Sequence, residues 1–273
     1  MQGITGKVFV ITGGAQGIGL GAGEAIARAG GIVAIADING DAARAAAAQL
    51  REAGAQAAGY QWDVREHAKA EATIRRIETE LGPVRGLVAS AGVVNAGRSE
   101  TLDPLRWGDG LAINLSGVFF ACQAAGARML EHGGGSIVTL SSVTGLQGQP
   151  ARALYSSTKW GVIGMTKTLA VEWGHRGIRV NAISPNAVDS PLMRASSAGD
   201  FLQSVILDRT PLARAARIDE VASAILFLLS DAASYINGVV LPVDGGLTSG
   251  YMTHKHGDET GSVDVRKAEA KVS

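Results

Sequence analysis

Short apolar runs alternate with longer helix-like segments along most of this chain of 273 residues. Most of these runs are apolar at every position, which is typical of strands covered on both faces of a parallel sheet. The expected strands span residues 8–12, 32–37, 57–63, 86–89, 136–140, 179–183 and 239–243. The expected helices span residues 17–29, 41–53, 66–81, 112–131, 151–173 and 219–230. This alternation predicts one doubly wound α/β domain built on a seven-stranded parallel sheet.

Two segments depart from this alternation. Residues 184–211 follow the sixth expected strand and carry Pro185, Pro191 and Pro211. They are interpreted as a substrate loop with a short helix near residues 200–209. Residues 251–273 are polar and are expected to form a mobile tail or an arm that rests on another subunit. The predicted domain therefore spans residues 1–250, and the tail follows it.

The overall charge of the chain is balanced, with 25 basic and 25 acidic residues. This balance argues against a nucleic-acid partner, because such proteins carry a basic footprint. No apolar run is expected to span a bilayer, and the N-terminus enters the first strand directly, so no signal peptide is expected. The single Cys122 cannot form an intrachain disulfide and fits a reducing compartment. These features predict a cytoplasmic protein without a membrane partner.

A glycine-rich segment, residues 12–19 with the sequence TGGAQGIG, joins the first expected strand to the first expected helix. Glycine permits a tight turn and lets the backbone approach a pyrophosphate closely. The following helix directs free N–H groups and its positive dipole end to the same place. A glycine motif alone is weak, and a packing turn is the alternative. Its position between a strand and a helix indicates dinucleotide binding.

Asp37 closes the second expected strand, where a carboxylate can accept hydrogen bonds from the ribose hydroxyls of NAD. The same carboxylate would repel the 2′-phosphate of NADP. Gln16 and Ile38, the flanking positions, are not basic, so NAD(H) is the predicted cofactor. Asp63, at the end of the third expected strand, is expected to accept a hydrogen bond from the adenine amino group.

Tyr155 and Lys159 stand four positions apart on an expected helix, which places a phenol and an ammonium on one face, one turn apart. A nearby positive charge favours the phenolate, so Lys159 is expected to lower the pKa of Tyr155 and to make it a proton-transfer group. This spacing alone is weak, because many surface helices carry it by chance. Ser142 lies upstream and adds a hydroxyl that is able to hold a substrate oxygen.

Taken together, these motifs resemble those of the short-chain dehydrogenase/reductase family. The resemblance runs from about residue 7 to residue 246 and rests on several separated motifs in the same order. They are the turn at residues 12–19, Asp63-Val64, Ala91-Gly92, Asn114, Ser142, Tyr155, Lys159, Pro185 and the Asp-Gly-Gly at residues 244–246. The resemblance implies a Rossmann-type sheet and a homotetramer, with a homodimer as the alternative.

The resemblance also implies residue roles. Tyr155 is similar to the catalytic acid/base, Ser142 to the residue that polarises the substrate oxygen, Lys159 to the lysine that holds the nicotinamide ribose, and Asn114 to the residue that anchors a water in a proton relay. The expected cofactor residues are Gly13, Gln16, Gly17, Ile18, Gly19, Asp37, Ile38, Asp63, Val64, Ala91, Gly92, Tyr155, Lys159, Pro185, Val188 and Ser190. The expected substrate residues are Val94, Ser142, Thr144, Gln149, Tyr155 and Asn186.

The chain departs from the family pattern at three positions. Ser90 stands where asparagine is usual, Asn186 where glycine follows the proline, and Ser190 where threonine is usual. Ser90 lacks the second hydrogen-bonding group of an amide, so a less rigid cofactor pocket with unchanged chemistry is expected. Asn186 has a side chain that is able to face the substrate.

The predicted function is an NAD(H)-dependent oxidoreductase that interconverts a secondary alcohol and a ketone. Two alternatives stay open, an NADPH-dependent reductase of a carrier-bound 3-oxoacyl group and a non-catalytic regulator that senses NAD. The substrate is open among polyols, hydroxy acids, cyclic alcohols and steroids. No metal is expected, because His254, His256 and Asp258 in the polar tail are more typical of a solvated segment.

Overall fold

The computed structural model describes residues 2–191, 193 and 206–250. The strands are β1 Val8–Thr12, β2 Ile32–Asp37, β3 Ala57–Gln61, β4 Val84–Ala89, β5 Gly135–Leu140, β6 Ile178–Pro185 and β7 Val240–Val243. They form a seven-stranded sheet in the order β3-β2-β1-β4-β5-β6-β7, and every neighbouring pair is parallel. The predicted doubly wound, Rossmann-like α/β fold is confirmed.

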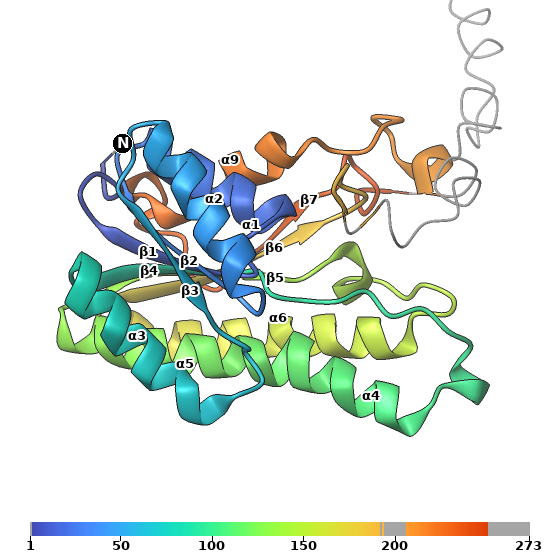
Figure 1. Ribbon diagram of the computed structural model, residues 1–273. Coiled ribbons are helices and arrows are strands. Elements are labelled where there is room, and N and C mark those ends of the chain that lie inside the picture. Colours follow the sequence, from blue (N-terminus) through green and yellow to red (C-terminus); the bar gives the residue numbers. More distant parts are fainter. Residues whose placement is uncertain (1, 192, 194–205, 251–273) are drawn as a thin grey trace, which may run out of the picture.

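Helices cover both faces of the sheet (Figure 1). One face carries α1 Gly17–Arg28, α2 Gly40–Glu52 and α9 Ile218–Leu229, and the other carries α3 His67–Leu81, α5 Gly117–Glu131 and α6 Ala153–Gly174. Each layer has its own apolar core, with Ile26, Ala47 and Ile225 on the first face and Ile74 and Ala121 on the second. The strands are apolar throughout because side chains on both faces enter these two cores.

Some predicted boundaries were wrong. The third strand ends at Gln61, so Asp63 lies beyond it. A helix that the sequence did not predict, α4 Pro104–Leu111, precedes α5 and continues into it through a π-helical turn, Ala112–Ser116. Asp103 caps α4 by accepting the Leu105 N–H at 3.0 Å, with proline at the first helical position. Gly108 and Gly110 concealed the helix because they interrupt its apolar pattern.

The segment 184–211 is described only in part. A 3-10 turn, Leu207–Arg209, falls within the predicted short helix at 200–209, and the rest of that helix lies outside the described residues. The predicted tail at 251–273, with its three candidate metal ligands, also lies outside them. Further 3-10 turns are Ser99–Thr101, Val143–Gly145 and Asp231–Ala233.

The direction of winding reverses between β1 and β4. From β1 the chain proceeds outward to β2 and β3, and from β4 it proceeds the other way to β7. Ligands of open parallel sheets bind beyond the carboxyl ends of the strands at such a switch point. Thr12 pairs with Ala89 there, which brings the glycine turn beside the loop that follows β4.

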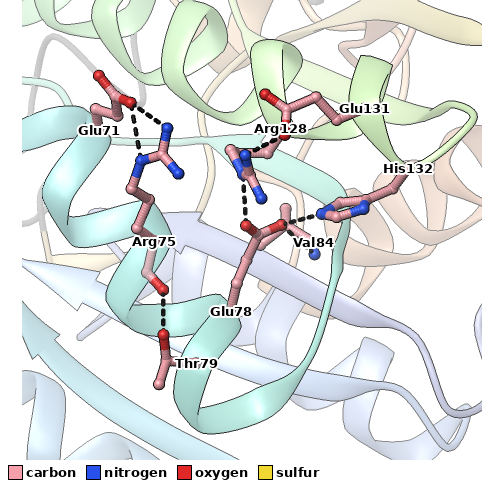
Figure 2. Close-up of polar contacts among 8 residues, drawn as sticks. All are labelled: Glu71, Arg75, Glu78, Thr79, Val84, Arg128, Glu131 and His132. Atoms are coloured by element: carbon pink, nitrogen blue, oxygen red, sulfur yellow. Dashed lines mark hydrogen bonds and ion pairs between the residues drawn. The ribbon is translucent and has the colours of Figure 1, made fainter.

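A cluster of charged groups joins α3, α5 and the start of β4 (Figure 2). Glu78 of α3 accepts hydrogen bonds from the Arg128 Nε at 2.6 Å and from the Val84 N–H at 3.1 Å, and its other contact is the His132 ring at 2.8 Å. Burial alone would raise the pKa of Glu78, but its hydrogen-bond donors and the charge of Arg128 hold the pKa below the usual range. The cluster therefore stabilises the fold when Glu78 is ionised.

Glu78→Ala is expected to lower the free energy of unfolding by about 2–3 kcal/mol, because the mostly buried Arg128 then keeps only the exposed Glu131 as its partner and His132 loses its contact. A lowered folded-state pKa stabilises the protein above the unfolded-state value, near ~4.3, and the stabilisation is lost as the pH falls through the folded-state value. The wild type should therefore lose its advantage over the variant below about pH 4. Urea unfolding at several pH values measures this difference.

Glu71→Ala on the same helix is the matched control, because its pair with Arg75 is more than half exposed on both sides. We expect less than about 0.5 kcal/mol from that change. Equal losses in the two variants would contradict a stabilising role for the Glu78 cluster.

The continuous helical stretch Pro104–Glu131 is 28 residues long and apolar enough to cross a membrane by length and composition. The expectation that no apolar run reaches this length was wrong by this measure. Half of its most apolar window is buried inside the domain, where α5 covers the sheet. Core helices of α/β domains meet the same criterion, so the stretch by itself carries no membrane assignment.

Candidate active site

A large pocket opens at the carboxyl ends of the strands, beside the switch point, with a volume of about 1020 Å³. That volume is at the upper end of the range for small-molecule sites. The predicted residues that line it are Gly13, Gln16, Gly17, Ile18, Asp37, Ile38, Asp63, Val64, Ala91, Gly92, Val94, Ser142, Thr144, Gln149, Tyr155, Lys159, Pro185, Asn186, Val188 and Ser190. Gly19 and Asn114 do not line it. One cavity thus joins the predicted cofactor and catalytic residues.

The glycine turn forms one wall of the pocket. Gly13 has a φ of 63°, and a Cβ there would lie 2.7 Å from the Ala91 Cα. Gly19 is buried behind the turn, where a Cβ would lie 2.3 Å from the Gly13 carbonyl oxygen. Gln16, the N-cap of α1, makes no side-chain capping bond, and the first turn holds no acidic residue. The turn is therefore a close-packed cradle with free helix N–H groups, as a pyrophosphate requires.

The end of β2 supplies the polar groups at the adenosine side. Asp37 accepts the Ala15 N–H at 3.2 Å and the Asn39 N–H at 3.0 Å, so its carboxylate is held beside the turn. Trp62 lines the same pocket, and its buried Nε1 has no hydrogen-bond partner within the described part of the chain. A glycine-rich turn, a carboxylate held beside it and an indole N–H without an acceptor among the described residues fit a dinucleotide.

Asp63 does not stand alone at this end. Both of its oxygens accept hydrogen bonds from the Arg65 guanidinium at 2.6–3.0 Å, and Arg65 also lines the pocket. The hydrogen bonds from Arg65 outweigh burial and lower the pKa of Asp63. Sequence reasoning missed this basic residue at the pocket, because its pairing depends on the conformation of the loop that follows β3.

The predicted catalytic residues come from the end of β5 and from α6. Ser142 follows β5, and its Oγ accepts the Thr144 N–H at 3.3 Å. The Nζ of Lys159 donates to the Leu140 carbonyl at 2.8 Å and lies 5.5 Å from the centroid of the Tyr155 ring. Ser141 donates to the Lys159 carbonyl at 3.0 Å, which ties α6 to β5. The structure thus places a phenol, a hydroxyl and an ammonium together in the pocket.

The ionisation of these groups differs from the prediction. Burial raises the pKa of Tyr155, and the Ser142 hydroxyl and the charge of Arg152 oppose that rise only in part. Burial also lowers the pKa of Lys159 to about 8. The prediction that Lys159 lowers the pKa of Tyr155 was wrong for this structure. The ammonium is bound to a carbonyl group, and desolvation dominates at the phenol.

Asn114 lies in the π-helical turn and is fully buried. Its amide donates to the Val93 carbonyl and accepts the Val93 N–H, both at 2.8 Å. A Cβ on Gly92 would lie 3.2 Å from its Oδ1. The side chain thus holds the loop after β4, which lines the pocket, and the predicted water relay stays a prediction.

At the substrate end of the pocket, the polar side chain predicted to face the substrate is already hydrogen-bonded to the protein. Asn186 lines the pocket, but its amide nitrogen donates to the Thr210 Oγ1 at 2.9 Å and to the Asp244 carbonyl at 3.4 Å. Arg152 also lines the pocket, and the sequence did not single it out. Its only signal was its position three residues before Tyr155.

The chain matches a family model described as "Enoyl-(Acyl carrier protein) reductase" over residues 4–248. It is 42% identical over 248 residues to the D-threitol dehydrogenase of Mycolicibacterium smegmatis, covering 90% of this chain and 94% of that one. It is 37% identical over 247 residues to the 2-(S)-hydroxypropyl-CoM dehydrogenase 3 of Xanthobacter autotrophicus, covering 89% and 97%.

Among solved structures, the fold matches a gluconate 5-dehydrogenase from Burkholderia cenocepacia in complex with NADP and tartrate. That match has a TM-score of 0.86 and 34% identity, and it covers 90% of this chain and 96% of the other. The glycine cradle, the Tyr155 site and these full-length matches lead to one conclusion: the chain belongs to the short-chain dehydrogenase/reductase family and is an oxidoreductase.

Proposed function

We propose that this protein is an NAD(H)-dependent dehydrogenase that interconverts a secondary alcohol and a ketone. The observation that carries the proposal is a single pocket lined by the glycine turn and Asp37 at one end and by Ser142, Tyr155 and Lys159 at the other. Relatives named as dehydrogenases of hydroxyl-bearing compounds support the same reaction.

In the oxidation direction, Tyr155 accepts the proton of the substrate hydroxyl as its carbon becomes a carbonyl. Ser142 donates a hydrogen bond to the same oxygen and stabilises its developing charge. Bound NAD supplies the hydride acceptor. The raised pKa keeps Tyr155 protonated near neutral pH, so the phenol is ready to donate its proton during ketone reduction.

Lys159 and Asn114 have supporting roles in this proposal. The Nζ of Lys159 is held at the Leu140 carbonyl beside Tyr155, from where it is able to meet the ribose of the nicotinamide. The contacts of Asn114 with Val93 support a positioning role at the pocket wall. The remaining cofactor residues have the roles that the family pattern implies.

NAD is proposed over NADP because Asp37 holds a carboxylate at the adenosine end. NADP is the second candidate, because Arg65 lines the pocket and the Burkholderia enzyme was crystallised with NADP. The bidentate pair with Asp63 engages the guanidinium of Arg65, which favours NAD.

Asp37→Ala is expected to raise the kcat/KM for NADP relative to that for NAD by about 10- to 100-fold. The change removes the repulsion of the 2′-phosphate of NADP and also the carboxylate that accepts hydrogen bonds from the ribose hydroxyls of NAD. Asp41→Ala on the exposed start of α2 is the control and should leave the ratio unchanged. Steady-state kinetics with both cofactors measure the effect. An unchanged ratio in the Asp37 variant would remove the basis for NAD.

The proposed reaction is tested by following nicotinamide reduction with polyols, hydroxy acids, cyclic alcohols and steroids, each offered with NAD and with NADP. We expect turnover of at least one secondary alcohol with NAD. Binding of NADH without turnover of any compound would favour the NAD-sensing regulator, and a preference for NADPH with a carrier-bound 3-oxoacyl group would favour the reductase.

We also propose a cytoplasmic homotetramer, with a homodimer as the alternative and no nucleic-acid or membrane partner. Large apolar side chains are exposed on α4 and α6, among them Leu105, Trp160 and Val171, and a partner subunit would cover them. Light scattering of the purified chain measures the assembly.

A further inference from the structure

The substrate end of the pocket holds an arginine with one buried nitrogen for which the described residues supply no acceptor. Arg152 lines the pocket, and its Nη1 is buried with no hydrogen-bond partner within the described part of the chain. A guanidinium has five N–H donors, and a buried N–H group without an acceptor is costly. Thr144 lines the same pocket, and its Oγ1 is also buried without a partner in the described residues. Two side chains of the pocket lining therefore carry polar atoms for which the described residues supply no partner.

The backbone fixes Arg152 in this place. Ala151 has a φ of 58°, a conformation that residues other than glycine adopt at a cost in strain. Its carbonyl accepts the Gly97 N–H at 3.0 Å, and the Arg152 carbonyl accepts the Ser156 N–H at 2.7 Å. The Arg152 side chain does not cap its own helix α6. The strained Ala151 and two backbone hydrogen bonds therefore fix the backbone of Arg152 at the N-terminus of α6. The guanidinium is not used to cap that helix.

The charges around Arg152 favour an anion over a neutral group. Among the described lining residues the carboxylates are Asp37 and Asp63, which follow β2 and β3 at the adenosine end. Beside Tyr155 the charged lining residues are Arg152 and Lys159, both basic. Lys159 already donates to the Leu140 carbonyl, whereas the Nη1 of Arg152 has no such acceptor among the residues that the structure describes.

We propose that Arg152 binds a carboxylate of the substrate, so that the enzyme oxidises a hydroxy acid rather than a neutral polyol, cyclic alcohol or steroid. Arg152 is the N-cap residue of α6 and Tyr155 lies in the first turn of that helix. One substrate of moderate size is therefore able to place its carboxylate at Arg152 and its hydroxyl at Tyr155. Thr144 supplies a second polar contact. The inference rests on the proposed function, because it names the substrate class of the same site.

The test compares lactate, gluconate and hydroxycyclohexanecarboxylate with their primary amides, using wild type, Arg152→Gln and Arg152→Lys. Glutamine keeps a hydrogen-bond donor and removes the charge. For the best acid, Arg152→Gln should lower kcat/KM by about 100-fold, mainly through KM, while the amide changes by less than about 3-fold. Arg152→Lys should recover part of the loss for the acid alone. Arg28→Gln, on the exposed end of α1, is the control and should change neither substrate.

Other results would overturn the inference. Equal losses for acid and amide in Arg152→Gln would make Arg152 a structural residue, and a wild type that prefers the amides would mean that no acid group is bound. Both outcomes leave the proposed alcohol oxidation in place. No turnover of any alcohol by the wild type would instead overturn the proposed function, and this inference with it.

Discussion

Tyr155→Phe is expected to lower kcat by about 1000-fold, because general acid–base catalysis of this kind contributes roughly 100- to 10,000-fold. Phenylalanine keeps the ring and removes the atom that takes the alcohol proton. Cofactor binding should persist, since the glycine turn and Asp37 lie on other elements. The expected result is thus an enzyme that binds NADH and turns over almost nothing.

The measurement combines steady-state turnover with NADH fluorescence titration. Tyr235→Phe is the matched control, because that phenol is fully exposed, and it should keep the wild-type rate. If Tyr155→Phe retained more than about a tenth of wild-type turnover, the proton-transfer assignment would be wrong.

The raised pKa of Tyr155 gives the same assignment a pH signature. Oxidation needs the deprotonated phenol, so kcat/KM for the alcohol should rise from about pH 7 to about pH 10. Reduction needs the protonated phenol and should be fastest at lower pH. The alkaline rise should be absent from the residual activity of Tyr155→Phe.

Gly19→Ala is expected to weaken NADH binding by about 100-fold, because a displaced turn no longer presents its N–H groups to the pyrophosphate. Its Cβ would lie 2.3 Å from the Gly13 carbonyl oxygen and 3.0 Å from the Gly14 Cα, both backbone atoms that cannot rotate away. The turn that faces the pocket must therefore shift, although Gly19 itself does not line the pocket.

Gly108→Ala on α4 is the matched control, since a Cβ there meets no atom of the described residues within 4 Å. Alanine in a helix should even stabilise that variant slightly. Circular dichroism verifies the fold of both variants, and fluorescence titration gives their NADH affinities. Wild-type affinity in a folded Gly19→Ala would contradict the role of the turn as a cofactor cradle.

The sequence predicted most of the fold because its signals are local. The apolar runs mark buried strands. The glycine turn and the Tyr155–Lys159 spacing are short-range patterns that do not depend on contacts between residues distant in the sequence. α4 was missed because its helical residues include Gly108 and Gly110, and its stability comes from a proline start, a cap and packing against α6.

The parts of the site that could not be predicted depend on tertiary contacts. The hydrogen bonds between Asn114 and Val93 join residues 21 positions apart in the sequence. The hydrogen bond between Asn186 and Thr210 joins residues 24 positions apart. The pKa of Tyr155 depends on how deeply the phenol is packed, which spacing alone does not reveal. Arg152 was missed because an arginine before a helix is ordinary until the pocket around it is known.

The most direct test of the central claim uses a secondary alcohol deuterated at its carbinol carbon, with unlabelled NAD and the wild-type enzyme. Mass spectrometry of the reduced cofactor and of the organic product follows the label. Hydride transfer from alcohol to nicotinamide predicts one deuterium in each NADH formed and an equal amount of ketone. Unlabelled NADH, or NADH formed without the ketone, would contradict the account.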